Sequence, residues 1–330
     1  MIAITGAATP LGRELIGMFR EKNQPVRAID RLEMPWFAGC EMVLGDWYDP
    51  PTIERAVRGA QAVVHLAEAR PGDSRLCDFR SPDYDKELFR LNLESTRRLA
   101  EAARDAGVGR FLFASSESVY GPPPPEYPCS EQAPTEPHGP YGRSKLEAEL
   151  MLLEMQRRGE LDSVILRLAP ILGPFYPREA VIRRFFELAL RHLPIPVAGN
   201  GHLLKHCLHA RDAAELAERC LARPQAGGRI YNAAGRGAAT IRDIVQTVIE
   251  TLGSRSFLTP VPPAVLTLAD RLGRMAGRPL IDPEQAQNPF RHTCFSTGRA
   301  LAELGWRARY DTLETFAEAA RWYREHVWKK

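Results

Sequence analysis

Tyr141 and Lys145 are the two side chains whose types and spacing point most directly to chemistry. They begin a segment with helical periodicity, and a spacing of four residues places the phenol and the ammonium on one helix face. A tyrosine with a pKa of about 10 is a poor base at neutral pH, but a neighbouring ammonium favours the phenolate and lowers that pKa. The spacing therefore predicts a proton-transfer site. The alternative is that Tyr141 is only a packed aromatic side chain, but this would not explain why Lys145 lies on the same helix face.

A serine-rich segment ends the strand predicted over residues 110–115 and reads Ser115-Ser116-Glu117-Ser118. Parallel strands end at a common sheet edge, so these hydroxyl groups are expected beside the tyrosine. A serine there can orient a substrate oxygen, or it can simply form hydrogen bonds at the end of the strand. Either of the outer serines is an alternative to Ser116 for the first role.

A glycine-containing turn follows the first predicted strand and opens a helix, with the sequence Gly6-Ala7-Ala8-Thr9-Pro10-Leu11-Gly12. Backbone N–H groups and the helix dipole at such a turn can hold a pyrophosphate. Gly6 would allow the tight turn, and Gly12 the close packing of helix on strand. The usual middle glycine is Thr9, a β-branched residue with less freedom in φ, which could hold a phosphate farther away. The alternative is an ordinary strand-to-helix turn.

Asp30 ends the second predicted strand, where a carboxylate would accept hydrogen bonds from the adenosine ribose hydroxyls of a dinucleotide. This favours NAD as the cofactor, whereas the adjacent Arg31 could accommodate the 2′-phosphate of NADP. Ligands of open α/β sheets bind at the carboxyl ends of the strands. Further contacts are expected at the ends of the third and fourth predicted strands, from Asp46, Trp47, Leu66 and Ala67.

Short apolar runs alternate with helix-patterned segments through the first half of the chain, as in strand-helix-strand units with a parallel sheet. Strands are expected over residues 2–5, 26–30, 41–44, 62–66, 110–115, 164–168 and 230–232. Amphipathic helices are expected over residues 11–21, 52–57, 88–106, 141–157, 178–191, 211–221, 241–252, 263–275 and 312–326. Eight prolines within residues 121–140 predict a loop.

The predicted fold class is α/β, a doubly wound (Rossmann) parallel sheet with a smaller, mainly helical C-terminal substrate domain. Residues 1–169 are expected to form the NAD(P)-binding Rossmann domain, with residues 205–235 returning to it. Residues 170–204 and 236–330 are expected to form the substrate-binding domain.

The composition matches that of ordinary globular proteins, with 44% hydrophobic and 26% charged residues among 330. Basic and acidic residues, 44 and 41, are interspersed and give a net charge of +3, which argues for neither a nucleic-acid nor a membrane partner. No apolar run is long enough for a membrane span, and the N-terminus leaves no room for a signal peptide. Six scattered cysteines indicate reduced thiols in a cytoplasmic protein. Three histidines, His202, His206 and His209, lack accompanying ligand spacing, so no metal is expected.

Together these motifs resemble the extended short-chain dehydrogenase/reductases, also called the NAD-dependent epimerase/dehydratase family. The resemblance covers nearly the whole chain and rests on the glycine turn, Asp30, Gly45-Asp46, His65-Leu66-Ala67, Asn92, the Ser-Ser-x-x-Val-Tyr-Gly segment, Tyr141 with Lys145, and Leu304-Gly305-Trp306. It implies an enzyme that transfers a hydride between nicotinamide and a secondary alcohol or ketone.

The resemblance assigns roles to individual residues. Ser116 would orient the substrate oxygen, Tyr141 would be the acid/base, and Lys145 would bind the nicotinamide ribose and tune the phenol. The implied cofactor contacts are Gly6, Thr9, Pro10, Leu11, Gly12, Asp30, Arg31, Asp46, Trp47, Leu66, Ala67, Asn92, Tyr141 and Lys145. Asn92 could instead be an ordinary helix N-cap. The implied substrate contacts are Ser116, Glu117, Ser118, Lys205 and Arg291.

The favoured function is an NAD-dependent sugar-nucleotide epimerase that acts through a 4-keto intermediate. Two departures from the family's epimerases count against it: Pro170 replaces an asparagine, and Lys205 replaces an arginine and so loses bidentate geometry. The alternative is an NAD(P)-dependent ketone/alcohol oxidoreductase resembling the dihydroflavonol-reductase and hydroxysteroid-dehydrogenase branch. A sugar-nucleotide dehydratase is less favoured, because Glu117 provides only one of two adjacent acids and Ser118 follows it. By the same resemblance, helices from Leu88 and from Tyr141 would pair with their copies in a homodimer.

Overall fold

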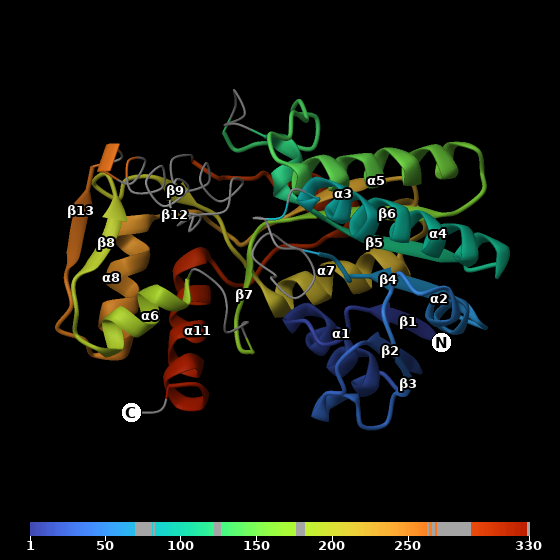
Figure 1. Cartoon of the computed structure of the whole chain (residues 1–330), viewed down its shortest axis with the longest axis horizontal. Coiled ribbons are helices and arrows are strands. Elements are labelled where there is room, and N and C mark those ends of the chain that lie inside the picture. The colour runs from blue at the N-terminus through green and yellow to red at the C-terminus, as the bar shows by residue number, and fades with distance from the viewer. Residues whose placement is uncertain are drawn as a thin grey trace.

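A seven-stranded parallel sheet forms the centre of the computed structural model, which describes residues 1–69, 81, 83–121, 127–175, 182–262, 264, 265, 268 and 292–328. The strand order is β11-β6-β5-β4-β1-β2-β3 (Figure 1). The strands are β1 (Ile2–Thr5), β2 (Val26–Asp30), β3 (Glu41–Leu44), β4 (Ala62–His65), β5 (Arg110–Ser116), β6 (Ser163–Leu168) and β11 (Ile230–Ala233). The predicted doubly wound α/β fold is confirmed.

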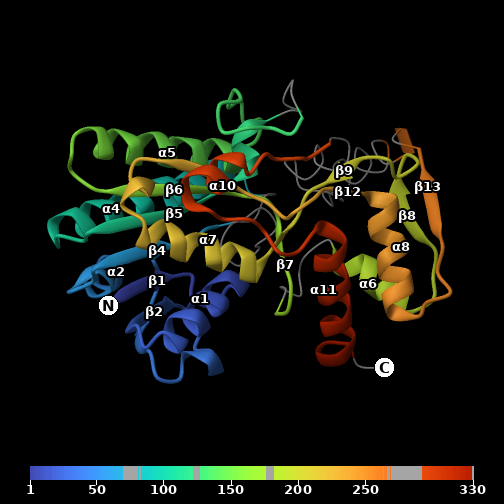
Figure 2. The ribbon, with the colours of Figure 1, turned by 180° about the vertical axis from the view of Figure 1, so that it is seen from behind.

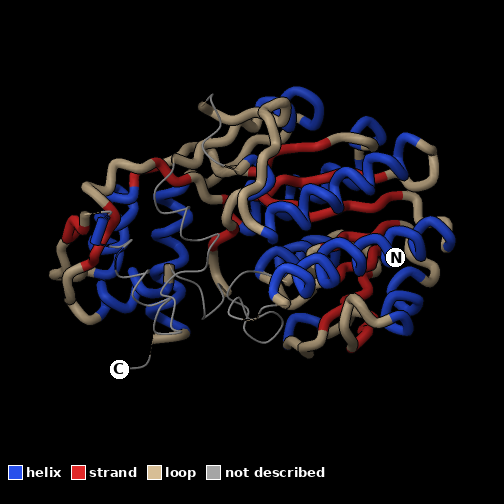
Figure 3. The backbone as a smooth tube through the Cα atoms, turned by 45° about the horizontal axis from the view of Figure 1, so that its top comes forward, coloured by secondary structure: helices blue, strands red, loops and turns tan. Residues whose placement is uncertain are grey.

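Helices cover both faces of this sheet, as the tube view shows (Figure 3). One face carries α1 (Pro10–Glu21) and α7 (Ala210–Ala222), which pack over the strands through one apolar cluster. The other face carries α2 (Pro50–Val57), α4 (Ser95–Asp105) and α5 (Pro140–Arg157), which share a second cluster. Because both faces are covered, the strands read as continuous apolar runs rather than alternating ones.

The strand order reverses between β1 and β4, since β2 and β3 continue from β1 in one direction and β5 and β6 continue from β4 in the other. Ligands of doubly wound sheets bind in the crevice at such a reversal. The turn after β1 and the residues after β4 meet there, and they meet closely: a Cβ on Gly6 would lie 2.7 Å from the backbone nitrogen of Ala67.

A small lobe lies beside the sheet and includes the last described residues of the chain (Figure 2). It consists of α6 (Arg183–Leu190), β8 (Ile195–Ala198), α8 (Ile241–Leu252), β13 (Leu258–Val261) and α11 (Thr312–His326). These elements share a core of their own, in which Phe186, Val248 and Phe316 are buried. A capping box between Asp311 and Glu314 starts α11.

The structure adds several elements that sequence patterning did not predict. They are α10 (Gly298–Leu304), β8, β13 and the two-residue strands β7 (Ile171–Leu172), β9 (Leu204–Lys205), β10 (Leu208–His209) and β12 (Ala239–Thr240). Strands of two to four residues are too short to show a period. Most of the predicted helix 263–275 and residues 122–126 of the proline-rich loop lie outside the described residues. The division into domains at residue 169 stays a prediction.

The predicted helix 88–106 is interrupted. It consists of α3 (Tyr84–Phe89), a π-helical turn over Arg90–Glu94, and α4. Such turns add one residue to a helical coil and frequently mark functional positions.

Candidate functional site

The turn after β1 is built for close approach of another group. Gly6 has a φ of +70°, a conformation that favours glycine. Thr9 has an ordinary φ of −70° and caps α1: its hydroxyl accepts a hydrogen bond from the Gly12 N–H at 3.1 Å and donates to the Gly6 carbonyl at 2.8 Å. This position therefore needs no glycine, and the reduced freedom of a β-branched residue is no obstacle to the turn. Pro10 and Leu11 continue it as the first turn of α1.

Gly12 is a tight packing point of α1, and Gly17 in the same helix is a matched control. A Cβ at Gly12 would lie 2.6 Å from the Ala7 carbonyl oxygen, whereas a Cβ at Gly17 would meet nothing within 4 Å. We expect Gly12→Ala to lower the melting temperature and weaken NAD binding by distorting the turn. Gly17→Ala should leave the melting temperature equal or raise it, because alanine is the better helix former. Thermal unfolding and NAD titration of both variants test this; equal behaviour of the two would contradict it.

The end of β2 presents the carboxylate expected for an adenosine ribose. Asp30 accepts hydrogen bonds from the backbone N–H groups of Ala8 and Leu32, at 2.9 and 3.1 Å. Arg31, which could have held a 2′-phosphate, forms an ion pair with Asp46 at 3.3 Å. The guanidinium is thus already paired with a carboxylate, and the Asp30 carboxylate lies at the end of β2, an arrangement that disfavours a 2′-phosphate and suits the ribose hydroxyls of NAD. The guanidinium also lies 5.9 Å from the ring of Trp47.

Asn92 lies within the π-helical turn, so it is not a helix N-cap. It is buried, and its side chain holds the chain after β4: its Oδ1 accepts from the Ala69 N–H at 2.8 Å, and its Nδ2 donates to the Ala69 carbonyl at 3.0 Å. The same Nδ2 donates to the Ser144 hydroxyl on α5 at 3.2 Å. Asn92 thus joins the segment that follows Leu66 and Ala67 to the helix that carries Tyr141.

Tyr141 and Lys145 start α5 on one face, as predicted, and both contact a third side chain. The Tyr141 hydroxyl donates to Glu68 Oε2 at 2.9 Å, and Lys145 Nζ lies 2.6 Å from the same oxygen. Lys145 is buried and also donates to the Ala114 carbonyl at 2.8 Å. Burial and the charge of Lys145 lower the pKa of nearby His65 to about 3, so this histidine is neutral at physiological pH.

Sequence reasoning did not single out Glu68. The signal was present, because this carboxylate directly follows His65-Leu66-Ala67 at the edge where ligands bind.

The structure distinguishes the three serines after β5. Ser115 is buried and donates to Glu149 on α5, so its hydroxyl is committed to the core. Ser116 is half-buried, and its Oγ accepts from the backbone N–H of Ser118. The first turn of α5 lies against this segment, since a Cβ on Gly142 would come within 2.7 Å of the Ser118 carbonyl. Ser116 is therefore the better candidate for contact with a substrate beside Tyr141.

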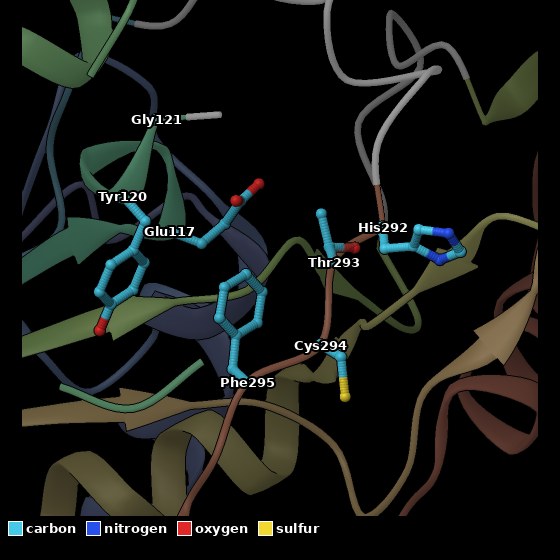
Figure 4. Close-up of a pocket in the computed structure, with 7 residues that line it drawn as sticks. All are labelled: Glu117, Tyr120, Gly121, His292, Thr293, Cys294 and Phe295. Atoms are coloured by element: carbon cyan, nitrogen blue, oxygen red, sulfur yellow. The ribbon is translucent and has the colours of Figure 1, made fainter. Parts of the chain in front are cut away.

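The expected substrate contacts come from both parts of the molecule. Glu117 is buried and lines a narrow pocket, together with Tyr120, Gly121, His292, Thr293, Cys294 and Phe295 (Figure 4). Burial raises the pKa of Cys207 to about 12, and this thiol interacts electrostatically with both Lys205 and Glu117. The N–H of Thr293, which lines the pocket with Glu117, donates to the carbonyl of Leu204 at 2.9 Å, so β9 with Lys205 lies beside this pocket. Arg291 lies outside the described residues.

Two of the three clustered histidines have structural roles. His206 Nε2 contacts the Gly235 carbonyl at 2.8 Å, and His209 Nε2 lies 3.1 Å from Glu318. Within the described ranges, no three His, Cys, Asp or Glu side chains are grouped so as to hold a metal ion. Over the same ranges, no helix has the length and apolar character needed to cross a bilayer.

Comparison with known proteins decides the family. The model of the NAD dependent epimerase/dehydratase family matches residues 2–234, well over half of the chain. The chain belongs to this family. This NAD-dependent epimerase/dehydratase is therefore an enzyme, and the family whose motifs it resembles is confirmed.

Several relatives match this epimerase/dehydratase along most of its length. A dTDP-glucose 4,6-dehydratase of Streptomyces antibioticus is 28% identical, with 98% of this chain and 92% of the relative covered. A UDP-glucose 4-epimerase of Azospirillum brasilense is 27% identical, with 97% and 90% covered. Among solved structures, MoeE5 in complex with UDP-glucuronic acid and NAD is 26% identical, has a TM-score of 0.79, and is matched over 99% of both chains.

The crevice of this epimerase/dehydratase fits the cofactor in the family's name. The glycine turn leads into the N-terminus of α1 beside the strand reversal, and Asp30 lies at the end of β2. A pyrophosphate at the helix N-terminus and a ribose beside Asp30 would use these groups.

Proposed function

We propose that this enzyme is a sugar-nucleotide 4-epimerase that uses NAD for transient oxidation at C4. The observation that carries the proposal is the Tyr141-Lys145 pair beside the Ser116 segment, at the sheet edge next to the strand reversal. Whole-chain similarity to proteins whose names specify UDP-glucose or dTDP-glucose supports a nucleotide sugar as the substrate.

The chain's own residues provide the proton transfer. Bound NAD would supply the hydride acceptor and donor. Tyr141 would take the proton from the C4 hydroxyl as the C–H bond at C4 breaks, and a 4-keto sugar would result. Ser116 would donate a hydrogen bond to the C4 oxygen, and Lys145 would hold positive charge beside the phenol. After the 4-keto sugar rotates in the site, Tyr141 would return the proton to the C4 oxygen as hydride is added to the opposite face of C4.

The segment after β5 favours epimerisation over dehydration. Loss of water requires one group to protonate the leaving hydroxyl and another to remove a proton from the neighbouring carbon. Glu117 could serve as one of them, but Ser118 is not a comparable acid or base. The N–H and hydroxyl of Ser118 also form hydrogen bonds with the Ser116 hydroxyl.

Simple ketone reduction is the second candidate. The segment Pro260-Val261-Pro262-Pro263, which leads into an expected apolar helix, looks closer to that branch, and its first two residues end β13 of the small lobe. Pairing of β13 with β8 gives this segment a structural role, whereas the relatives described above have nucleotide sugars in their names.

One experiment separates the three functions. The purified protein is incubated with UDP- and dTDP-hexoses, and the products are identified by chromatography and mass spectrometry. An epimerase yields a new sugar nucleotide of unchanged mass without added cofactor. A product lighter by one water would indicate a dehydratase. Net consumption of nicotinamide cofactor with a ketone or alcohol would indicate an oxidoreductase.

We also propose that the enzyme is a homodimer paired through α4 and α5. Leu150 on α5 is 57% exposed, and a second subunit packed on this helix would cover this apolar side chain. Native mass spectrometry of the same sample counts the subunits of 36.9 kDa and detects retained NAD.

A further inference from the structure

We propose that Glu68 is a positioning residue of the proton-transfer site, whose carboxylate keeps the Tyr141 phenol protonated and holds the Lys145 ammonium beside it. The inference concerns the ionisation of Tyr141 in the protein itself. It therefore does not depend on which substrate the enzyme uses.

The contacts place one oxygen between the two groups. Glu68 Oε2 accepts a hydrogen bond from the Tyr141 hydroxyl at 2.9 Å and lies 2.6 Å from Lys145 Nζ. The Glu68 side chain is 9% exposed and that of Lys145 is 2% exposed, so water screens these charges weakly. An ion pair in such surroundings is also held in place by the Ala114 carbonyl, which accepts from the same ammonium.

The backbone on both sides of Glu68 is anchored, which fixes the direction of its side chain. Ala67 N–H donates to the Thr5 hydroxyl at 3.4 Å, and Ala69 is bonded through both its N–H and its carbonyl to Asn92. Since Asn92 also contacts Ser144 on α5, the Glu68 segment and the helix that carries Tyr141 are held together.

The two charges act on the phenol in opposite directions. The ammonium favours the phenolate, and the carboxylate disfavours it and accepts the hydrogen bond of the neutral form. Two other tyrosines show the effect of a glutamate partner: Tyr231 donates to Glu303 at 2.8 Å, and Tyr323 donates to Glu187 at 3.1 Å. In both, burial and then the glutamate raise the pKa of the phenol.

Neither His65 nor the ion pair of Arg143 with Asp85 replaces this control. His65 on β4 is neutral near physiological pH, because its pKa is about 3. Arg143 and Asp85 form an exposed ion pair at 3.1 Å, so their charges offset each other.

As a consequence, Tyr141 is held in its protonated form, in which it can act as an acid. Oxidation of an alcohol needs the phenolate form of Tyr141, whereas reduction of a ketone needs its phenol form. Glu68 therefore raises the pH at which proton removal begins.

The test measures the ionisation of Tyr141 without substrate or cofactor. The tyrosinate absorbance of each protein is titrated with pH and compared with that of the same protein carrying Tyr141→Phe, so that the difference isolates this phenol. We expect Glu68→Gln to lower the midpoint by about one pH unit or more. Glu68→Ala also removes the charge and should shift the midpoint in the same direction, so either variant decides if the other fails to fold.

Controls separate this role from a structural one. Lys145→Met should raise the midpoint, whereas Glu187→Gln, which breaks the pair with Tyr323, should leave that of Tyr141 unchanged. Glu68→Asp retains the charge and should restore part of the shift. An unchanged or higher midpoint in both Glu68→Gln and Glu68→Ala would overturn the proposal. Inactivity towards nucleotide sugars would instead concern only the proposed function.

Discussion

Replacing Tyr141 with phenylalanine is expected to lower turnover by about 10²- to 10⁴-fold, the range for loss of a positioned acid/base. The ring remains, so its packing in the apolar cluster with Trp47, Ala67 and Leu91 is kept, and the hydroxyl that donates to Glu68 disappears. NAD affinity should change little. Single-turnover rates and NAD titrations of the wild type and the variant measure the two quantities separately.

Tyr323→Phe is the matched control for this substitution. Its hydroxyl also donates to a glutamate, Glu187, but it lies on α11 of the small lobe. Removing it should leave turnover within a few-fold of wild type. Retained activity in Tyr141→Phe would refute the proton-transfer role, and equal losses in both variants would indicate a general effect of losing a tyrosine-glutamate pair.

Glu149→Ala is expected to destabilise the fold by about 3–5 kcal/mol, the cost of leaving one partner of a buried ion pair uncompensated. Arg167 Nη2 lies 2.7 Å from Glu149 Oε2, and the two side chains are 5% and 1% exposed. Burial lowers the pKa of Arg167, but the hydrogen bonds and charge of Glu149 outweigh burial and hold that pKa above its ordinary value. Denaturant unfolding gives the change in free energy.

Two further variants test the cause of that loss. Replacing both partners with apolar residues, Glu149→Leu with Arg167→Met, should recover much of the stability because no buried charge remains. Arg157→Met removes an exposed partner of Glu154 on the same helix and should not measurably change the melting temperature. If Glu149→Ala were as harmless as Arg157→Met, the buried pair would not hold β6 to α5.

The strands and helices of the sheet were predictable because their signals are local. The bounds predicted for β1, β2 and β3 match the structure, and those of β4, β5 and β6 differ by one residue at one end. Covered parallel strands give continuous apolar runs that need no tertiary information to recognise. The small lobe gave weaker signals, since β8 and β13 pair across more than fifty residues and each contains a proline, which weakens a strand pattern.

The candidate site was predictable where one motif carried its own spacing. Tyr141 and Lys145 share a face because the helix period dictates it. The choice of Ser116 over Ser115 needed the structure, because only tertiary packing brings Glu149 to the latter. Glu68 follows the end of β4, which is a sequence signal for a ligand site, but its partners lie 73 and 77 residues away along the chain and only the structure shows them.

The π-helical turn over Arg90–Glu94 makes the site sensitive to the number of residues in a helix as well as to their identity. Each residue of an α-helix rotates the chain by about 100°. Deleting a single residue from this turn would give a more regular helix, yet it would rotate α3 relative to α4 and carry Asn92 away from Ala69. A one-residue deletion here would therefore detach the chain after β4 from α5 while improving the local hydrogen bonding of the helix.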